Sequence, residues 1–324
     1  MTGRLLAELA RRYDVDLARV HLVPVQGAAN ETWALGERWV VRIARSGHEA
    51  DLAKEAAVVP VVPVVRAAGV PVPALVEHDA GARHGRPYAV VERSSGTALD
   101  DPGLSPAVRH EGHRDLGRVL RRLHEAVPSA PPAVEADPQG DPHALVDDLL
   151  LRRWVGTDDA AWLHGWFALL DPWRPADPPL VLLHGDAAPQ NVLVDPTTGR
   201  VRALLDWGDA SCADPAVDLA KVPPRHLPDA VAGYVGDHGS SDAELAWGAR
   251  ALTHHLAWAL ARLPTAPRPD DPAGPPLRPR ACSPSCGWPS RRPRRCGRTS
   301  SRLRRAEARP SRGRRGAPGR DSTG

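Results

Sequence analysis

The sequence lacks any apolar run approaching the roughly 20 residues needed to cross a bilayer. It also lacks the uninterrupted apolar segment of a secretory signal near its start. Cysteine is scarce: there are four, and three of them, Cys282, Cys286 and Cys296, fall within the last 60 residues. The composition therefore argues against a membrane protein, a secreted protein and a disulfide scaffold. We expect a cytoplasmic location.

Lysine, phenylalanine and isoleucine are almost absent, with two, one and one residues. A GC-rich gene would produce this bias. The same bias is stronger in residues 265–324, which contain 16 Arg and no Lys among Pro, Gly and Ser and show no apolar periodicity. This composition predicts a disordered basic tail. We interpret the tail as a frameshifted reading of GC-rich coding, with a basic nucleic-acid-binding arm as the alternative.

Charge is unevenly distributed along the chain. The tail holds only four acidic residues and so has a net charge of +12, which leaves −9 on the first 264 residues given the whole-chain value of +3. An acidic body argues against nucleic acid as a partner and favours a cationic substrate, because a cleft of one sign gathers ligands of the other. A solvated acidic surface is the simpler alternative.

Hydrophobic patterning predicts an α+β chain with two lobes. Residues 1–95 should form a small β-rich N-lobe, in which Pro60 and Pro63 either end a helix near Val59 or interrupt it as a duplicated tripeptide. Residues 96–264 should form a larger, mostly helical C-lobe. Strands are predicted at 21–25, 31–35, 37–43, 74–77, 88–92, 180–183, 191–194 and 202–205. Helices are predicted at 4–13, 51–68 (with the proline interruption), 109–126, 142–154, 158–170, 216–221 and 242–262.

The most informative segment is 180–220, in which short apolar strands alternate with polar turns. Asp186 and Asn191 lie five residues apart on the first turn, and Asp206 follows the hairpin at the start of the second. Antiparallel pairing of the intervening strands would return Asp206 to the neighbourhood of Asn191. Three oxygen-bearing side chains should then converge. Ordinary turn polarity is the alternative, because Asp and Asn favour such positions.

These three side chains suit phosphoryl transfer. Magnesium prefers one or two protein oxygens together with phosphate oxygens and water, and Asn191 and Asp206 would supply them. The reaction also needs a carboxylate that orients the attacking hydroxyl and accepts its proton. We assign that role to Asp186, which does not require a raised pKa for it.

Three motifs in this segment resemble those of the aminoglycoside phosphotransferase family. His184–Asn191 (HGDAAPQN) is similar to the catalytic loop H-G-D-x-x-x-x-N, and Leu205–Asp209 (LDWGD) to the metal-binding I-D-W segment. Asp214–Ala220 (DPAVDLA) is similar to the D-P-x-x-D-L-A stretch that follows. The resemblance covers about residues 20–262 and implies a protein-kinase-like fold. It also implies that His184 and Asp218 brace the catalytic loop.

The resemblance assigns nucleotide contacts in the N-lobe as well. Gly27 and Asn30 belong to the segment that stands where the family has its phosphate-covering loop, although G-x-G-x-x-G is absent. Arg42 takes the place of the phosphate-binding cation, and Glu55, or alternatively Glu49, would be its ion-pair partner.

Residues 90–94, which include Glu92 and Ser94, resemble the hinge whose backbone meets the adenine.

The chain is thus expected to be a kinase of a small hydroxylated molecule, using ATP and Mg²⁺, as a monomer or dimer. An aminoglycoside is the first candidate acceptor, and related families phosphorylate macrolides, choline, homoserine or sugars. The helices at 142–170 and 242–262 would bind it. The alternative is a catalytically impaired, kinase-like nucleotide-binding protein.

Overall fold

The computed structural model describes residues 2–264, apart from 25–28, 59–60, 128, 130, 132–133 and 238. All the described residues belong to one compact unit of the chain. The predicted tail and Gly27 lie outside them. Within the described ranges, no helix combines the length and the apolar character that crossing a membrane requires.

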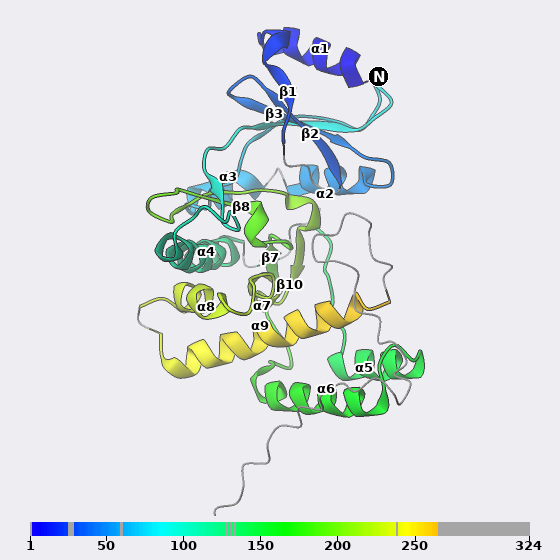
Figure 1. Cartoon of the computed structure of the whole chain (residues 1–324), viewed down its shortest axis with the longest axis vertical. Helices are drawn as coiled ribbons and strands as arrows, with labels where there is room; N and C mark the ends of the chain where they lie inside the picture. The colour runs from blue at the N-terminus through cyan, green and yellow to red at the C-terminus, as the bar shows by residue number, and fades with distance from the viewer. Residues whose placement is uncertain are drawn as a thin grey trace, which may run out of the picture. The chain divides into compact units, whose positions relative to one another are not determined.

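An antiparallel five-stranded sheet forms the N-terminal part, with the strand order β1-β2-β3-β5-β4 (Figure 1). The prediction of a β-rich N-terminal region is confirmed, with strand ends shifted by at most three residues. The strands are β1 (Val20–Leu22), β2 (Asn30–Leu35), β3 (Trp39–Ala44), β4 (Leu75–Asp79) and β5 (Tyr88–Glu92).

Strand β3 has different neighbours on its two faces. Val41 and Ile43 pack with buried leucines of the helix α1 (Thr2–Arg12). Side chains alternate between faces along a strand, so Arg42 points the other way, like Ala44, which packs against Leu52. Leu52 belongs to the helix α2 (Glu49–Val58). The alternation therefore aims Arg42 at α2.

The prolines divide the segment after β3, as predicted. Helix α2 ends at Val58, and the separate helix α3 (Val62–Ala67) begins with Pro63 in its first turn. A proline there costs nothing, because the first amide groups of a helix have no partner within it. Pro60 itself lies outside the described residues.

The C-terminal part is built mainly from helices. Helix α4 (Pro106–Ala126) buries the predicted stripe of Leu116, Val119, Leu120 and Leu123. It packs closely on α8 (Leu227–Val235), which the sequence did not predict. The other helices are α5 (Pro142–Leu151), α6 (Thr157–Leu170), α7 (Ala216–Leu219) and α9 (Ser241–Ala261).

Two small antiparallel sheets hold the segment 180–213. Strand β7 (Val181–Leu183) pairs with β10 (Ser211–Ala213). Strand β8 (Val192–Val194) pairs with β9 (Val201–Leu204) on one side and with β6 (Thr97–Ala98) on the other. The β8–β9 pairing is the hairpin that the sequence predicted. Strands β6 and β10 were not predicted.

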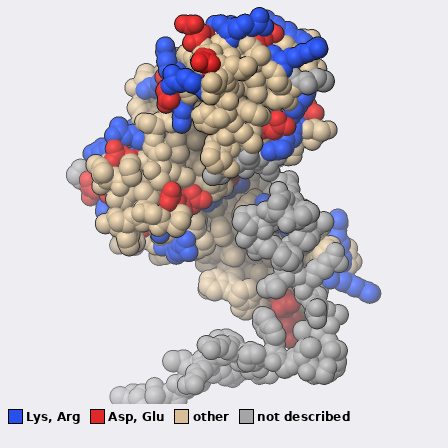
Figure 2. All heavy atoms as spheres, turned by 45° about the horizontal axis from the view of Figure 1, so that its top comes forward, with Lys and Arg blue, Asp and Glu red and all other residues tan. Residues whose placement is uncertain are grey.

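Charges of both signs are interspersed over the surface that holds α1 and the five-stranded sheet (Figure 2). Several of them are paired: Arg12 contacts both Glu8 and Glu77, and Arg86 contacts Glu31. Ion pairs at the surface, such as that of Arg12 with Glu8, contribute little to stability. They leave no single-sign field on the face shown.

Candidate active site

The catalytic-loop segment lies between β7 and β8 and ends in the 3₁₀ turn η4 (Pro189–Asn191). The Asn191 Nδ2 donates hydrogen bonds to the carboxylate Oδ2 of Asp186 (2.8 Å) and to its backbone oxygen (3.0 Å). The Leu205 amide, next to Asp206, donates to the Asn191 carbonyl (2.8 Å). The hairpin therefore brings Asp186, Asn191 and Asp206 together at one end of the strands.

Asp218 holds the backbone of this loop in place. Its two carboxylate oxygens accept hydrogen bonds from the amides of His184 (2.9 Å) and Gly185 (2.8 Å), and His124 lies 3.1 Å from one of them. Burial raises the pKa of Asp218, but these hydrogen bonds outweigh it and hold the pKa below its usual value. The predicted bracing role is confirmed.

Gly185 can only be a glycine here. Its φ is +83°, and a β-carbon would overlap the carbonyl oxygen of Asp209. Beside it, the fully buried His184 ring meets the face of Trp207 edge-on, with centroids 4.7 Å apart, and accepts a hydrogen bond from the Asp186 amide (3.3 Å). His184 thus braces the loop, as the resemblance implies, and Trp207 packs against it.

Arg42 links α2 to the turn after β9. Its Nη1 lies 2.7 Å from both carboxylate oxygens of Glu55, and its Nη2 lies 2.5 Å from the Asp206 Oδ1. The side chains of Arg42 and Glu55 are only 12% exposed. Burial raises the pKa of Glu55, while Arg42 opposes it. Glu55, and not Glu49, is the partner of Arg42.

The oxygen atoms left over fit a magnesium ion. Asn191 uses only its amide nitrogen toward Asp186, and no donor in the described part of the chain reaches its Oδ1. Asp206, in left-handed backbone conformation (φ +64°), has Oδ2 free of hydrogen bonds to described residues. One amide and one carboxylate oxygen match the sparse protein ligation of Mg²⁺. Asn191 and Asp206 can therefore hold this ion.

Asp186 lies where this group of residues meets a large cleft. Burial raises its pKa, and the nearby carboxylates of Asp209 and Asp206 add to the rise, whereas Lys221 and His184 oppose it. The Lys221 Nζ is 3.9 Å from the Asp186 Oδ1. A raised pKa makes the carboxylate a better proton acceptor, a feature that the sequence did not require.

The cleft has a volume of about 1140 Å³. Its lining includes Asp186 but not Arg42, Asn191 or Asp206. The predicted acceptor helices contribute Leu145 of α5 and Trp258 of α9, but no residue of α6 lines it. The charged lining residues, most of which sequence reasoning missed, are Lys54, Glu135, Asp137, Asp141, Arg174, Asp186, Asp209, Lys221 and Arg262.

The remaining predicted nucleotide contacts lie apart from this cleft. Glu92 and Ser94 line a separate cavity of about 410 Å³, in which Arg66 donates to the Glu92 carboxylate (3.2 Å). Asn30 is buried at the start of β2, and its Oδ1 has no hydrogen-bond partner in the described part of the chain.

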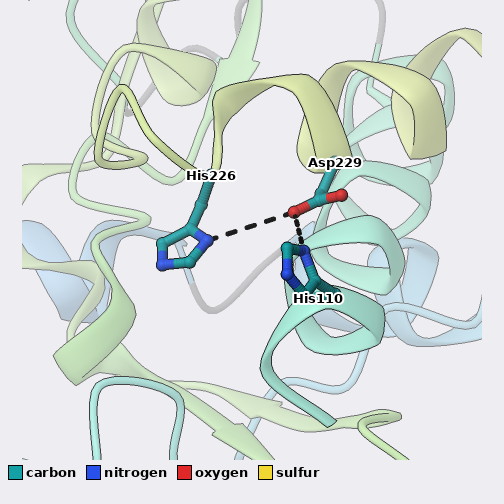
Figure 3. A group of neighbouring side chains, drawn as sticks. All are labelled: His110, His226 and Asp229. Atoms are coloured by element: carbon teal, nitrogen blue, oxygen red, sulfur yellow. Dashed lines mark hydrogen bonds and ion pairs between the residues drawn. The ribbon is translucent and has the colours of Figure 1, made fainter. Parts of the chain in front are cut away.

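A second group of possible metal ligands lies outside the cleft. His110 on α4 and the pair His226 and Asp229 at the start of α8 point toward one another (Figure 3). The His110 Nδ1 is 2.7 Å from the Asp229 Oδ2, and the His226 Nδ1 is 4.0 Å from it. The short hydrogen bond already uses His110 and Asp229. We therefore assign this cluster to packing between α4 and α8.

Comparison with known proteins identifies related sequences. The sequence model described as "Phosphotransferase enzyme family" matches residues 21–253. An aminoglycoside 3'-phosphotransferase of Streptomyces fradiae is 35% identical over 160 residues, 47% of this chain and 57% of that protein. The Streptomyces ribosidificus enzyme of the same name is 31% identical over 156 residues, 47% of this chain and 58% of that protein. The chain thus spans a little over half the length of these curated relatives.

Solved structures share the fold. The GDP complex of an aminoglycoside 2'-phosphotransferase superposes with a TM-score of 0.59 at 17% identity, covering 75% of this chain and 83% of that one. A macrolide 2'-phosphotransferase of Brachybacterium faecium gives 0.56 at 21% identity, covering 80% and 90%. These likenesses confirm the kinase-like fold, with its N-terminal antiparallel sheet and helical C-terminal part.

Proposed function

Because the chain belongs to the phosphotransferase enzyme family, we propose that it is an ATP- and Mg²⁺-dependent kinase of a small alcohol. The observation that carries the proposal is the place of Asp186. Its carboxylate faces the 1140 Å³ cleft on one side and is hydrogen-bonded to Asn191 on the other. A carboxylate between an acceptor space and a magnesium-ligand pair is what in-line phosphoryl transfer needs.

Each residue then has a definite task. Asp186 orients the acceptor hydroxyl and takes its proton as the acceptor oxygen bonds to the γ-phosphorus and the bond from that phosphorus to the β-phosphate oxygen breaks, releasing ADP. Bound magnesium would neutralise charge on the phosphates. Asn191 and Asp206 would hold the ion through their free oxygens. Arg42 fixes the position of Asp206.

Nucleotide use is supported by relatives of the same fold. Solved structures of this fold include a GDP complex of an aminoglycoside 2'-phosphotransferase and a ternary complex of a relative with ATP and streptomycin. We extend nucleotide binding to this chain on the strength of its Arg42–Glu55–Asp206 arrangement. The first candidate acceptor remains an aminoglycoside, as in the names of its curated relatives.

A coupled ADP-release assay on the full chain with MgATP tests the proposal. The panel contains an aminoglycoside, a macrolide, choline and homoserine. We expect release above the acceptor-free rate with at least one of them. A chain that binds ATP but never shows acceptor-dependent release would instead be the impaired, kinase-like binding protein.

A further inference from the structure

Both lysines of the chain line the cleft that contains Asp186. Among 42 basic residues only Lys54 and Lys221 are lysines, so arginine serves at every other basic position. Both lysines nevertheless fall among the cleft-lining residues. An ammonium group is a compact charge that an arginine fork does not replace. The position of the two lysines suggests that the compact charge of an ammonium group has a function in the cleft.

Lys221 is held with its ammonium group beside the reaction centre. It follows α7, and its side chain is only 16% exposed. The Nζ lies 4.7 Å from the centre of the Trp258 ring and 3.9 Å from the Asp186 Oδ1. The second distance is too long for a hydrogen bond. The ammonium group therefore keeps donors for another group in the cleft.

A second cation shares the same aromatic ring. The guanidinium carbon of Arg262 lies 5.1 Å from the Trp258 centroid. No carboxylate in the described part of the chain forms an ion pair with Arg262. Two cations therefore lie over one indole, and both line the cleft, so they can attract an anionic group even though Asp186 and Asp209 line it too.

This local charge restricts what can stand next to the reacting hydroxyl. A hydroxyl that bonds to the Asp186 Oδ1 lies close to Lys221, whose ammonium group repels a cationic group of the acceptor and attracts an anionic one. The acidic lining residues Glu135, Asp137 and Asp141 belong to a different segment, so an amine elsewhere on the acceptor is compatible with the cleft.

We propose that Lys221 and Arg262, over the indole of Trp258, form an anion subsite that binds a carboxylate or phosphate group of the acceptor beside its reacting hydroxyl. This inference rests on the proposed kinase function. A hydroxy acid or a phosphorylated alcohol fits this position of the cleft, and an aminoglycoside would have to place its ammonium groups away from Lys221.

Four probes with the same diol skeleton test the subsite: glycerate, glycerol 3-phosphate, glycerol and 3-amino-1,2-propanediol. The full chain is first saturated with Mg²⁺ and a non-hydrolysable ATP analogue. Thermal unfolding midpoints then report binding without turnover. We expect glycerate, glycerol 3-phosphate or both to raise the midpoint more than glycerol does, and the amine not to. The anion that raises the midpoint shows whether the subsite binds a carboxylate or a phosphate group. Anions no better than glycerol would overturn the proposal.

Substitutions of Lys221 and Arg262 show whether these residues bind the anionic group of the acceptor or only support Asp186. Lys221→Met should reduce the preference for the anionic probe over glycerol, in apparent Kd, by about tenfold, the usual loss for one charged hydrogen bond. Arg262→Met should act in the same direction, and Lys221→Arg should retain part of the preference. The control Arg200→Met, at an exposed position outside the cleft lining, should leave it intact.

Two results are incompatible with the subsite. One is an unchanged preference in both Met variants. The other is an equal loss for all probes in Lys221→Met, which would assign Lys221 to the support of Asp186 alone. The midpoint measurement reports binding and needs no phosphoryl transfer, whereas the ADP-release assay reports turnover. Failure of the subsite and failure of the kinase function therefore give different results.

Discussion

Arg42 and Asp206 are 164 positions apart in the chain, yet the guanidinium Nη2 of the first lies 2.5 Å from the carboxylate Oδ1 of the second. The same arginine binds both carboxylate oxygens of Glu55. One cation therefore joins strand β3, helix α2 and the turn that is expected to hold magnesium.

Removal of this cation should destabilise the fold. Arg42→Ala leaves two carboxylates facing each other without compensation, so we expect a loss of about 3–5 kcal/mol in the free energy of unfolding. Urea denaturation measures it. Arg19→Ala is the control, because its partner Glu37 is 74% exposed and the pair should be worth less than about 1 kcal/mol. Equal losses in the two variants would contradict the buried role of Arg42.

Asn191 and Asp206 should set the demand for magnesium. Asn191→Ala removes one of the two oxygens that we propose bind the ion, so the Mg²⁺ concentration for half-maximal ADP release should rise by at least about tenfold, and Asp206→Ala should abolish measurable release. Asp177→Asn, an exposed carboxylate outside the cleft lining, is the matched control. An unchanged Mg²⁺ requirement in Asn191→Ala would remove that residue from the metal site.

Gly185 should tolerate no side chain. Gly185→Ala meets both an unfavourable φ and the Asp209 carbonyl, which together should cost about 2–4 kcal/mol of unfolding free energy. Gly165→Ala is a contrasting substitution: Gly165 lies inside α6 with nothing within 4 Å of a β-carbon. It should gain about 0.5–1 kcal/mol from helix propensity. Chemical denaturation measures the change in unfolding free energy of both variants.

The bracing carboxylate should make stability depend on acidity. Because the folded pKa of Asp218 lies below its usual 3.8, its contribution is present above pH 3.8 and is lost as the pH falls through the folded value. Asp218→Asn should cost about 2–4 kcal/mol near pH 7. The difference in unfolding free energy between wild type and Asp218→Asn should shrink below pH 3.8. A difference that is constant down to the acid range would contradict this role.

The sequence predicted what depends on local pattern. The β8–β9 hairpin follows from two short apolar runs with a Pro-Thr-Thr-Gly turn between them, and antiparallel pairing then fixes the approach of Asn191 and Asp206. Helix α8 escaped prediction because Pro228 and Gly233 weaken its helical pattern. A β-carbon on Gly233 would overlap the Arg114 carbonyl of α4, so the reason for that glycine is a tertiary contact.

The cleft could not be predicted for a related reason. Lys221 and Trp258 lie 37 residues apart on separate elements, and only the packing of α7 on α9 brings them together. Glu135 and Asp137 fall in a proline-rich connection that carries no periodicity. The resemblance to a family indicated the proposed reaction centre, whereas the cleft wall proposed to select the acceptor depends on how the helices pack.

The most direct test of the account is the rate of ADP release by Asp186→Asn, measured beside its nucleotide affinity and its unfolding midpoint near pH 7. Burial raises the pKa of Asp186, so its ionised form is a cost to the folded state that disappears as the pH falls. We expect ADP release to fall by at least about a thousandfold, nucleotide affinity to stay within about threefold, and the midpoint to be no lower than in wild type. Release at the wild-type rate would contradict this expectation.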